Sequence, residues 1–167
     1  MALNTVIGDA AADSYVTIAY ADAFFASQTT TGIWPTLLAS KEAAAIDATR
    51  LLDSQFDWFG TICSDTQALR WPRNDAYDSD ERLLPVDRIP NIVMQATCYL
   101  MMYLIKNGGL NQFESNVSGI KVGPIDLKFT DNSVVGIPSF LIRLLAGLGT
   151  YTGPTNNMAH SVNALRS

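Results

Sequence analysis

Hydrophobic residues recur at helical spacing in four stretches of the chain. Two stretches follow residues that commonly cap helices: Thr17 precedes a repeat that ends near Ser27, and Ser40 precedes one that reaches Phe56. The other two start at proline, which suits a first helical turn because it has no backbone N–H to leave unsatisfied. We therefore expect helices over residues 17–27, 40–56, 90–106 and 138–148.

The third of these segments is apolar on almost every face. Its main stripe is accompanied by Met94, Cys98, Met101 and Met102 on the remaining faces. A helix of this kind is either surrounded by its own core or covered by another chain. The sequence leaves both interpretations open.

The period changes from helical to alternating between residues 117 and 130. Apolar residues alternate with small or polar ones on both sides of Gly123-Pro124, which predicts two short strands joined by a tight turn or one bent strand. An isolated hairpin is marginally stable in water, so we expect it to pair with another chain or to pack on helices. The apolar positions are Ile120, Val122, Ile125, Leu127 and Phe129.

The rest of the chain lacks a regular period. Residues 1–13 and 150–167 are small and polar, and we expect a flexible or partner-ordered arm and an extended, flexible tail around one domain of residues 14–149. Residues 57–89 form a long segment of the kind that carries function or an interface. The predicted fold class is mainly α: a small helical bundle with a β-hairpin or extended β arm and flexible terminal tails.

Charge and composition limit the classes of function that suit the chain. The chain carries 16 acidic and 11 basic side chains, a net charge of −5, whereas tight DNA binding requires clustered Lys and Arg. An acidic wall would still suit a channel through which DNA slides. We find no apolar run of the roughly 18–20 residues that a membrane span needs, no signal peptide and no CxxC spacing. We therefore expect synthesis in the cytoplasm, with Cys63 and Cys98 reduced.

Candidate catalytic and metal-binding groups are sparse. The only histidine, His160, lies in the predicted tail, which leaves no histidine-based triad or dyad within one chain. The segment Asp75–Glu81 has the composition of a calcium loop but lacks glycine at its sixth position. We therefore expect no enzymatic activity and no bound metal or cofactor.

Two arginines flank a Trp-Pro pair in the long segment. In one interpretation Trp71 anchors the loop on the core, while Arg70 and Arg73 pair with nearby acids such as Asp75 or Asp57. In the other, the three side chains stack on and neutralise single-stranded nucleic acid. A single cluster of this kind in an acidic chain favours the structural interpretation.

Several short motifs stand in an order that is similar to one known family. They are Tyr15-Val16-Thr17-Ile18-Ala19, Ala21-Asp22-Ala23-Phe24-Phe25, Trp34, Lys41-Glu42-Ala43-Ala44-Ala45-Ile46, Ala48-Thr49, Gly60, Gln67-Ala68-Leu69-Arg70-Trp71-Pro72-Arg73 and Ile89-Pro90. The series resembles the head-to-tail adaptor family of tailed bacteriophages, some of whose members carry the label DnaT-like single-stranded-DNA-binding protein. The resemblance covers residues 14–105, although residues 74–77 replace the glycine-bearing turn that is common after Trp-Pro-Arg.

This resemblance implies a structural virion protein at the head-tail interface, made in the host cytoplasm. It implies a homo-oligomeric, dodecameric ring that binds the portal protein and a tail or nozzle protein, continues the channel for double-stranded DNA without binding it specifically, and involves no membrane. We expect the contacts with the portal or with neighbouring subunits at Ile125, Leu127, Phe129, Tyr151 and Pro154. The alternative is a single-stranded-DNA-binding module that uses Arg70, Trp71 and Arg73.

Overall fold

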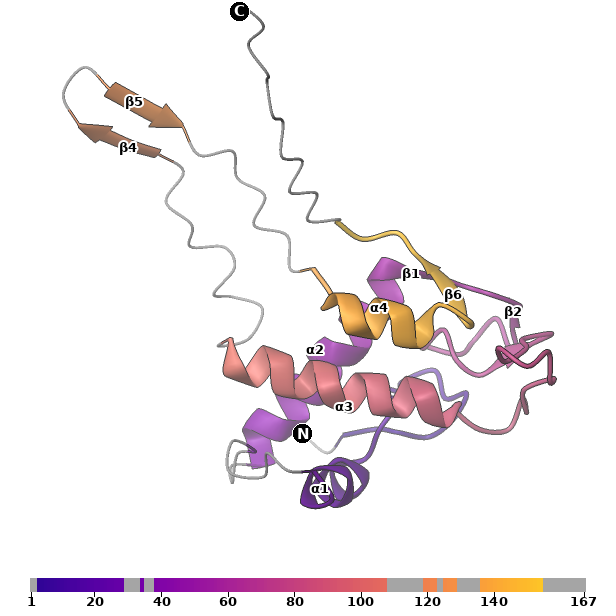
Figure 1. Cartoon of the computed structure of the whole chain (residues 1–167). Coiled ribbons are helices and arrows are strands. Elements are labelled where there is room, and N and C mark those ends of the chain that lie inside the picture. Colours follow the sequence, from indigo (N-terminus) through magenta and orange to yellow (C-terminus); the bar gives the residue numbers. More distant parts are fainter. Residues whose placement is uncertain are drawn as a thin grey trace, which may run out of the picture.

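The computed structural model describes residues 3–28, 34, 38–107, 119–122, 125–128 and 136–154 (Figure 1). In this part the order is α1 (Ile18–Ala26), α2 (Leu38–Gln55), β1 (Phe56–Trp58), β2 (Thr61–Ile62), β3 (Arg73–Asn74), α3 (Asn91–Lys106), β4 (Gly119–Val122), β5 (Ile125–Lys128), α4 (Ser139–Leu145) and β6 (Gly149–Tyr151). These helices and short antiparallel strands make a small mixed fold, which agrees in outline with the predicted bundle and hairpin.

The helix α3 is the central helix of the core. It packs across α2 and also contacts α1 and α4. Ala45 and Ala48 of α2 and Ala96 of α3 are completely buried. Small side chains let the two helices approach closely, because the distance between packed helices depends on the side chains at the contact. Most of the apolar side chains of α3 are therefore covered by the chain's own helices, whereas Ile92 and Met94 are only partly buried.

Most helix starts agree with the sequence pattern. The Thr17 hydroxyl caps α1 by accepting a hydrogen bond of 3.1 Å from a backbone N–H three residues on. Pro90 and Pro138 precede α3 and α4 as predicted. The prediction of a cap at Ser40 is wrong, because α2 begins at Leu38 and Ser40 lies in its first turn. Serine is common at both places, so its presence does not locate the first residue.

A strand pair joins the middle of the chain to its C-terminal part. β1 and β6 are antiparallel, with Phe56 opposite Tyr151 and Trp58 opposite Gly149. The Phe56 and Tyr151 rings meet edge-on at a centroid distance of 5.5 Å. Two predictions are therefore wrong: α4 ends at Leu145 instead of residue 148, and residues 150 and 151 belong to a strand instead of a tail. A strand of three residues is too short to show a period.

Residues 3–13 are held against the body, in contrast to the flexible arm that we expected. The Asp13 backbone N–H donates to the Asn4 carbonyl oxygen at 2.7 Å, and the Ala68 N–H donates to the Asp9 carbonyl oxygen at 3.1 Å. Ala12 is buried. The polar residues of this segment bind backbone groups locally, which fixes a turn where polarity alone suggested a solvated chain.

The predicted hairpin strands are present. β4 and β5 are antiparallel, with Ile120 opposite Leu127 and Val122 opposite Ile125. Within the described residues they pair only with each other. Gly123, Pro124 and Phe129 lie outside the described residues. None of the helices in the described ranges combines the length and the apolarity that crossing a membrane requires.

Candidate functional site

Trp71 lies in the core. Its side chain is only 1% exposed, and its ring meets that of Trp58 edge-on at a centroid distance of 5.8 Å. The indole Nε1 has no hydrogen-bond partner among the described atoms. Stacking of a nucleic-acid base requires an accessible aromatic face. Trp71 therefore anchors its loop and presents no such face.

Arg73 supports the same loop from inside. Its guanidinium donates to the carbonyl oxygens of Phe59 at 2.7 Å, Gly60 at 2.7 Å and Arg70 at 3.1 Å. Burial lowers the pKa of Arg73, and the nearby Arg70 lowers it further. Among the described residues, neither arginine forms the ion pair that we expected with an acid. The tight turns here leave carbonyl oxygens without backbone donors, and Arg73 satisfies them.

A buried carboxylate fastens this loop to α2. Asp53 Oδ1 accepts a hydrogen bond from the Tyr15 hydroxyl at 2.5 Å and one from the Trp58 indole N–H at 3.2 Å. Its Oδ2 accepts one from the Arg70 backbone N–H at 3.1 Å. Burial raises the pKa of Asp53, and these hydrogen bonds oppose the rise. All three partners belong to the fold, so Asp53 stabilises the structure.

A shallow polar depression adjoins this carboxylate. Its volume is about 350 Å³, and Arg50 and Arg70 line it together with Asp13 and Asp53. Two cations and two acids balance each other, so the depression has no strong preference for an anion. Of the three residues proposed for DNA binding, only Arg70 has an exposed side chain.

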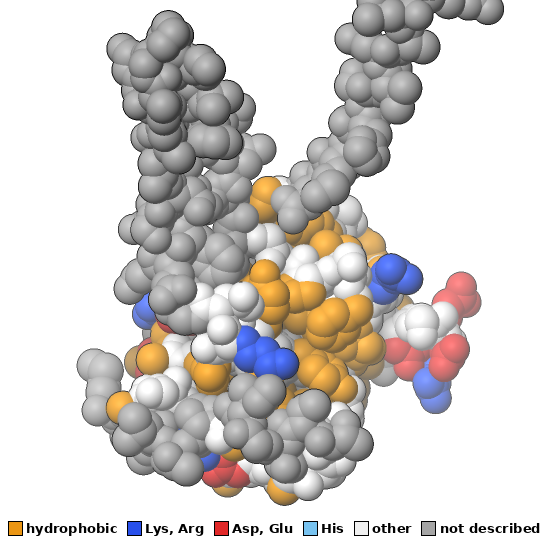
Figure 2. Space-filling model, turned by 60° about the vertical axis from the view of Figure 1, so that its left-hand side comes forward, with side chains coloured by type: hydrophobic (Ala, Val, Ile, Leu, Met, Phe, Trp, Pro, Cys, Tyr) orange, Lys and Arg blue, Asp and Glu red, His pale blue; other side chains and the backbone are white. Residues whose placement is uncertain are grey.

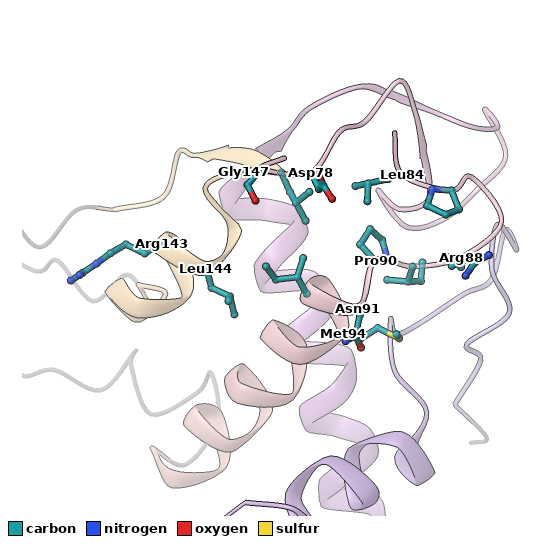
Figure 3. A pocket seen from close by; sticks show the side chains of 14 residues that line it. Asp78, Leu84, Arg88, Pro90, Asn91, Met94, Arg143, Leu144 and Gly147 are labelled. Carbon is teal, nitrogen blue, oxygen red and sulfur yellow. The ribbon is translucent and has the colours of Figure 1, made fainter. Parts of the chain in front are cut away.

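A larger, mainly apolar groove lies between α3, α4 and the loop of residues 78–90. Its volume is about 650 Å³. Its walls include Leu84, Pro90, Met94 and Leu144, and Figure 3 shows Arg143 and Arg88 at opposite ends of the view. Figure 2 shows hydrophobic side chains gathered over a broad area on one face of the molecule. A mainly apolar recess of this volume with a few charged groups at its ends is suited to binding.

Three exposed apolar residues are close in the sequence to residues that line the groove. Leu83 is 61% exposed, Val86 is 50% exposed and Phe140 is 51% exposed. From the sequence we expected only that residues 57–89 carry function or an interface. The groove itself was not predicted, because its walls come from a loop and two helices that meet only in the folded chain.

The acidic segment after β3 binds its own backbone. Asp78 Oδ1 accepts hydrogen bonds of 2.9 Å from the backbone N–H groups of Asp80 and Arg82. Those from Arg82 and Asp80, together with the Arg82 guanidinium, hold the pKa of Asp78 below its usual value. Within the described ranges, no three His, Cys, Asp or Glu side chains lie close enough to hold a metal ion.

Two of the expected contact residues are part of the folded body. The Tyr151 hydroxyl lies 3.0 Å from the Pro154 carbonyl oxygen and 3.2 Å from Gln55 Oε1. Ile125 and Leu127 lie in β5, and Phe129 lies outside the described residues. The structure therefore brings Tyr151 and Pro154 together and places them beside the end of α2.

The fold is that of a small helical protein braced by short strand pairs, with an apolar groove on its surface. The sequence matches the model of a family described as "Putative DnaT-like ssDNA binding protein" over residues 1–167, and the chain belongs to this family. No curated protein and no solved structure matches the chain. The family match agrees with the DNA-binding label and lends no support to the head-to-tail adaptor family.

Proposed function

We propose that this protein is a non-catalytic assembly protein that binds other protein chains, as a head-to-tail adaptor does. The groove of about 650 Å³ carries the proposal, because it exposes apolar side chains such as Met94 and Leu144. Concave, mainly apolar recesses of this volume commonly receive a ligand or a segment of a partner chain. A charged fraction of only 16% also suits a surface that partners cover. The proposed partners are further copies of the chain, a portal protein and a tail protein.

The test is the mass of the purified protein by light scattering, alone and with its cognate portal. We expect a complex much heavier than one chain, and we expect Leu144→Glu in the groove to reduce its formation. The matched control is Ile62→Glu, which places the same charge at an exposed apolar position on β2. A wild-type protein that stays monomeric and ignores the portal would contradict the proposal.

The second candidate function is the binding of single-stranded DNA, and the family match over residues 1–167 favours it. The structure restricts where such binding could occur, because Trp71 and Arg73 are buried. Arg50 and Arg70 remain as accessible cations beside the same depression. Phosphate contacts of this kind give an affinity that falls steeply with salt.

Titration of a fluorescent oligonucleotide at several salt concentrations tests this candidate. The double variant Arg50→Ala with Arg70→Ala should weaken binding and flatten its salt dependence. Arg82→Ala is the control, because Arg82 is equally exposed but already pairs with Asp78 and Asp80. The absence of binding at physiological salt would eliminate the DNA-binding function.

A further inference from the structure

We infer that the groove receives the Val6-Ile7 turn of a neighbouring copy of this chain. The inference rests on the proposed assembly function and deepens it, since it names the occupant of the groove and the residues that enter it.

The turn presents two apolar side chains to solvent in a fixed shape. Val6 is 62% exposed and Ile7 is 46% exposed. The Asp9 backbone N–H donates to the Val6 carbonyl oxygen at 3.2 Å, and the Val6 N–H donates to Asn4 Oδ1 at 3.0 Å. Gly8 follows with a φ of 74°, a conformation that favours glycine. A pre-shaped apolar tip loses little conformational entropy when it binds.

The charges beside the turn and the groove are complementary. Asp9 places a negative charge next to the apolar tip. It has no ion-pair partner in the described part of the chain, and its carboxylate accepts hydrogen bonds from the Ala11 backbone N–H at 2.7 Å and from the Asn4 side chain at 3.1 Å. Arg143 lies at one end of the groove and likewise has no ion pair among the described residues. Arg88, at the other end, pairs with Asp87 at 3.3 Å in an exposed position.

One acid also lines the groove, but its charge is compensated. The Asp78 carboxylate binds the Arg82 guanidinium at 3.0 Å as well as two backbone N–H groups. An apolar tip beside the Asp9 carboxylate therefore meets an apolar floor beside Arg143, which forms no ion pair in the described part of the chain. Opposite charges of this kind orient two surfaces more than they strengthen the contact.

The turn and the groove share no residue. A contact between them is therefore heterologous: each copy offers its turn to one neighbour and its groove to another. Such contacts continue from copy to copy and close into a ring when the rotation between copies permits it. This is the kind of contact that a ring-shaped assembly needs.

A mixing experiment with two full-length variants tests the inference. Ile7→Asp should disable the turn and Leu144→Asp the groove, each raising the dissociation constant of self-association by at least about tenfold. Each variant retains the surface that the other lacks. An equimolar mixture should therefore form pairs of two chains that grow no further, because the remaining turn and groove are both disabled.

Analytical ultracentrifugation reads out the result, and circular dichroism with thermal unfolding verifies that both variants fold. Ile62→Asp, at an exposed apolar position on β2 that is not part of the groove, is the control and should assemble like the wild type. The inference is overturned if Ile7→Asp assembles like the wild type, if the mixture stays monomeric, or if the wild type is monomeric alone and on its portal. Single copies that bind the portal would preserve the proposed function and overturn only this inference. Self-association through turn and groove without portal binding would support this inference and would remove the portal from the proposed partners.

Discussion

Tyr15 donates its hydroxyl hydrogen to Asp53 Oδ1 at 2.5 Å, which ties the segment before α1 to the side of α2. The same carboxylate binds Trp58 of β1 and the backbone of Arg70. One side chain thus joins three parts of the chain that lie far apart in sequence. The loop that carries Trp71 and Arg73 is held in place through it.

Replacing Asp53 by alanine should destabilise the protein strongly. The change leaves the Tyr15 hydroxyl, the Trp58 indole N–H and the Arg70 backbone N–H without their acceptor, the first two in partly buried positions. We expect the free energy of unfolding to fall by about 2–4 kcal/mol. Urea unfolding followed by tryptophan fluorescence measures this. Asp57→Ala, at an exposed position on β1, is the control and should change stability by less than about 0.5 kcal/mol. Equal effects of the two changes would contradict the role assigned to Asp53.

The pH dependence of stability should reveal the same carboxylate. Burial holds the pKa of Asp53 above its usual value, so the folded state binds the proton more tightly than the unfolded state. The stability that protonation provides is complete below about pH 4 and is lost as the pH rises through the folded-state pKa. The free energy of unfolding of the wild type relative to Asp53→Asn should therefore decrease from pH 4 towards pH 7.

Asp22 is a control for which the expected change of stability with pH is opposite to that of Asp53. Hydrogen bonds from Lys41 and Trp34 hold the pKa of Asp22 below its usual value. Its contribution is therefore present above about pH 4 and is lost as the pH falls through the folded-state pKa. The difference between the wild type and Asp22→Asn should decrease towards low pH. Parallel trends for Asp53 and Asp22 would refute both assignments.

The two arginines of the Trp-Pro segment should respond differently to substitution. Arg73→Ala leaves three carbonyl oxygens without their donor and should cost about 2 kcal/mol of stability. Arg70→Ala removes an exposed side chain and should cost less than about 0.5 kcal/mol. Thermal unfolding of both variants measures the contrast. A larger loss of stability for Arg70→Ala than for Arg73→Ala would assign the structural role to Arg70 instead of Arg73.

Gly60 and Gly8 offer a second matched pair. Both adopt positive φ, so alanine at either position is strained by about 1–2 kcal/mol. A Cβ at Gly8 meets no atom within 4 Å, whereas one at Gly60 would clash with the Asn74 carbonyl oxygen. Gly60→Ala should therefore cost at least about 2 kcal/mol more than Gly8→Ala in chemical unfolding. Similar losses would show that the backbone at Gly60 can move away.

Truncation of the C-terminal segment should be sensitive to where the cut is made. Removing residues 150–167 deletes most of β6 and the contact between Phe56 and Tyr151, and the midpoint of thermal unfolding should fall by several degrees. Removing residues 155–167 deletes none of the described contacts and should preserve the midpoint. Only the shorter deletion therefore tests portal binding without disturbing the fold. A lower midpoint after removal of residues 155–167 would contradict the expectation that these residues do not stabilise the fold.

The sequence predicted the elements whose signals are local. Thr17, Pro90 and Pro138 mark helix starts by the chemistry of a single turn, and the alternation around Ile120 and Ile125 indicates strands without tertiary information. It missed features that depend on distant partners. β6 exists because β1 lies beside it, and the acidic turn at Asp9 is fixed by a backbone contact with Ala68.

The candidate sites follow the same division. The composition of residues 70–73 suggested nucleic-acid contacts. In the structure Trp71 is buried in the core, and the Arg73 guanidinium binds backbone carbonyl oxygens, which no sequence pattern reveals. The groove was missed because Leu84, Met94 and Leu144 are ordinary apolar residues in three separate elements. Only their packing leaves a space between them.

The pairing of β1 with β6 also determines when β1 can complete its folding during synthesis. Gln55 and Tyr151, whose side chains meet beside this pair, are 96 positions apart. At the usual rate of roughly 5–20 residues per second, β1 waits on the order of 5–20 seconds for its partner strand to be made. During that interval Phe56 and Trp58 lack the strand that later pairs with β1. The nascent chain is thus open to chaperones and to aggregation until residues 149–151 have been made and have paired with β1.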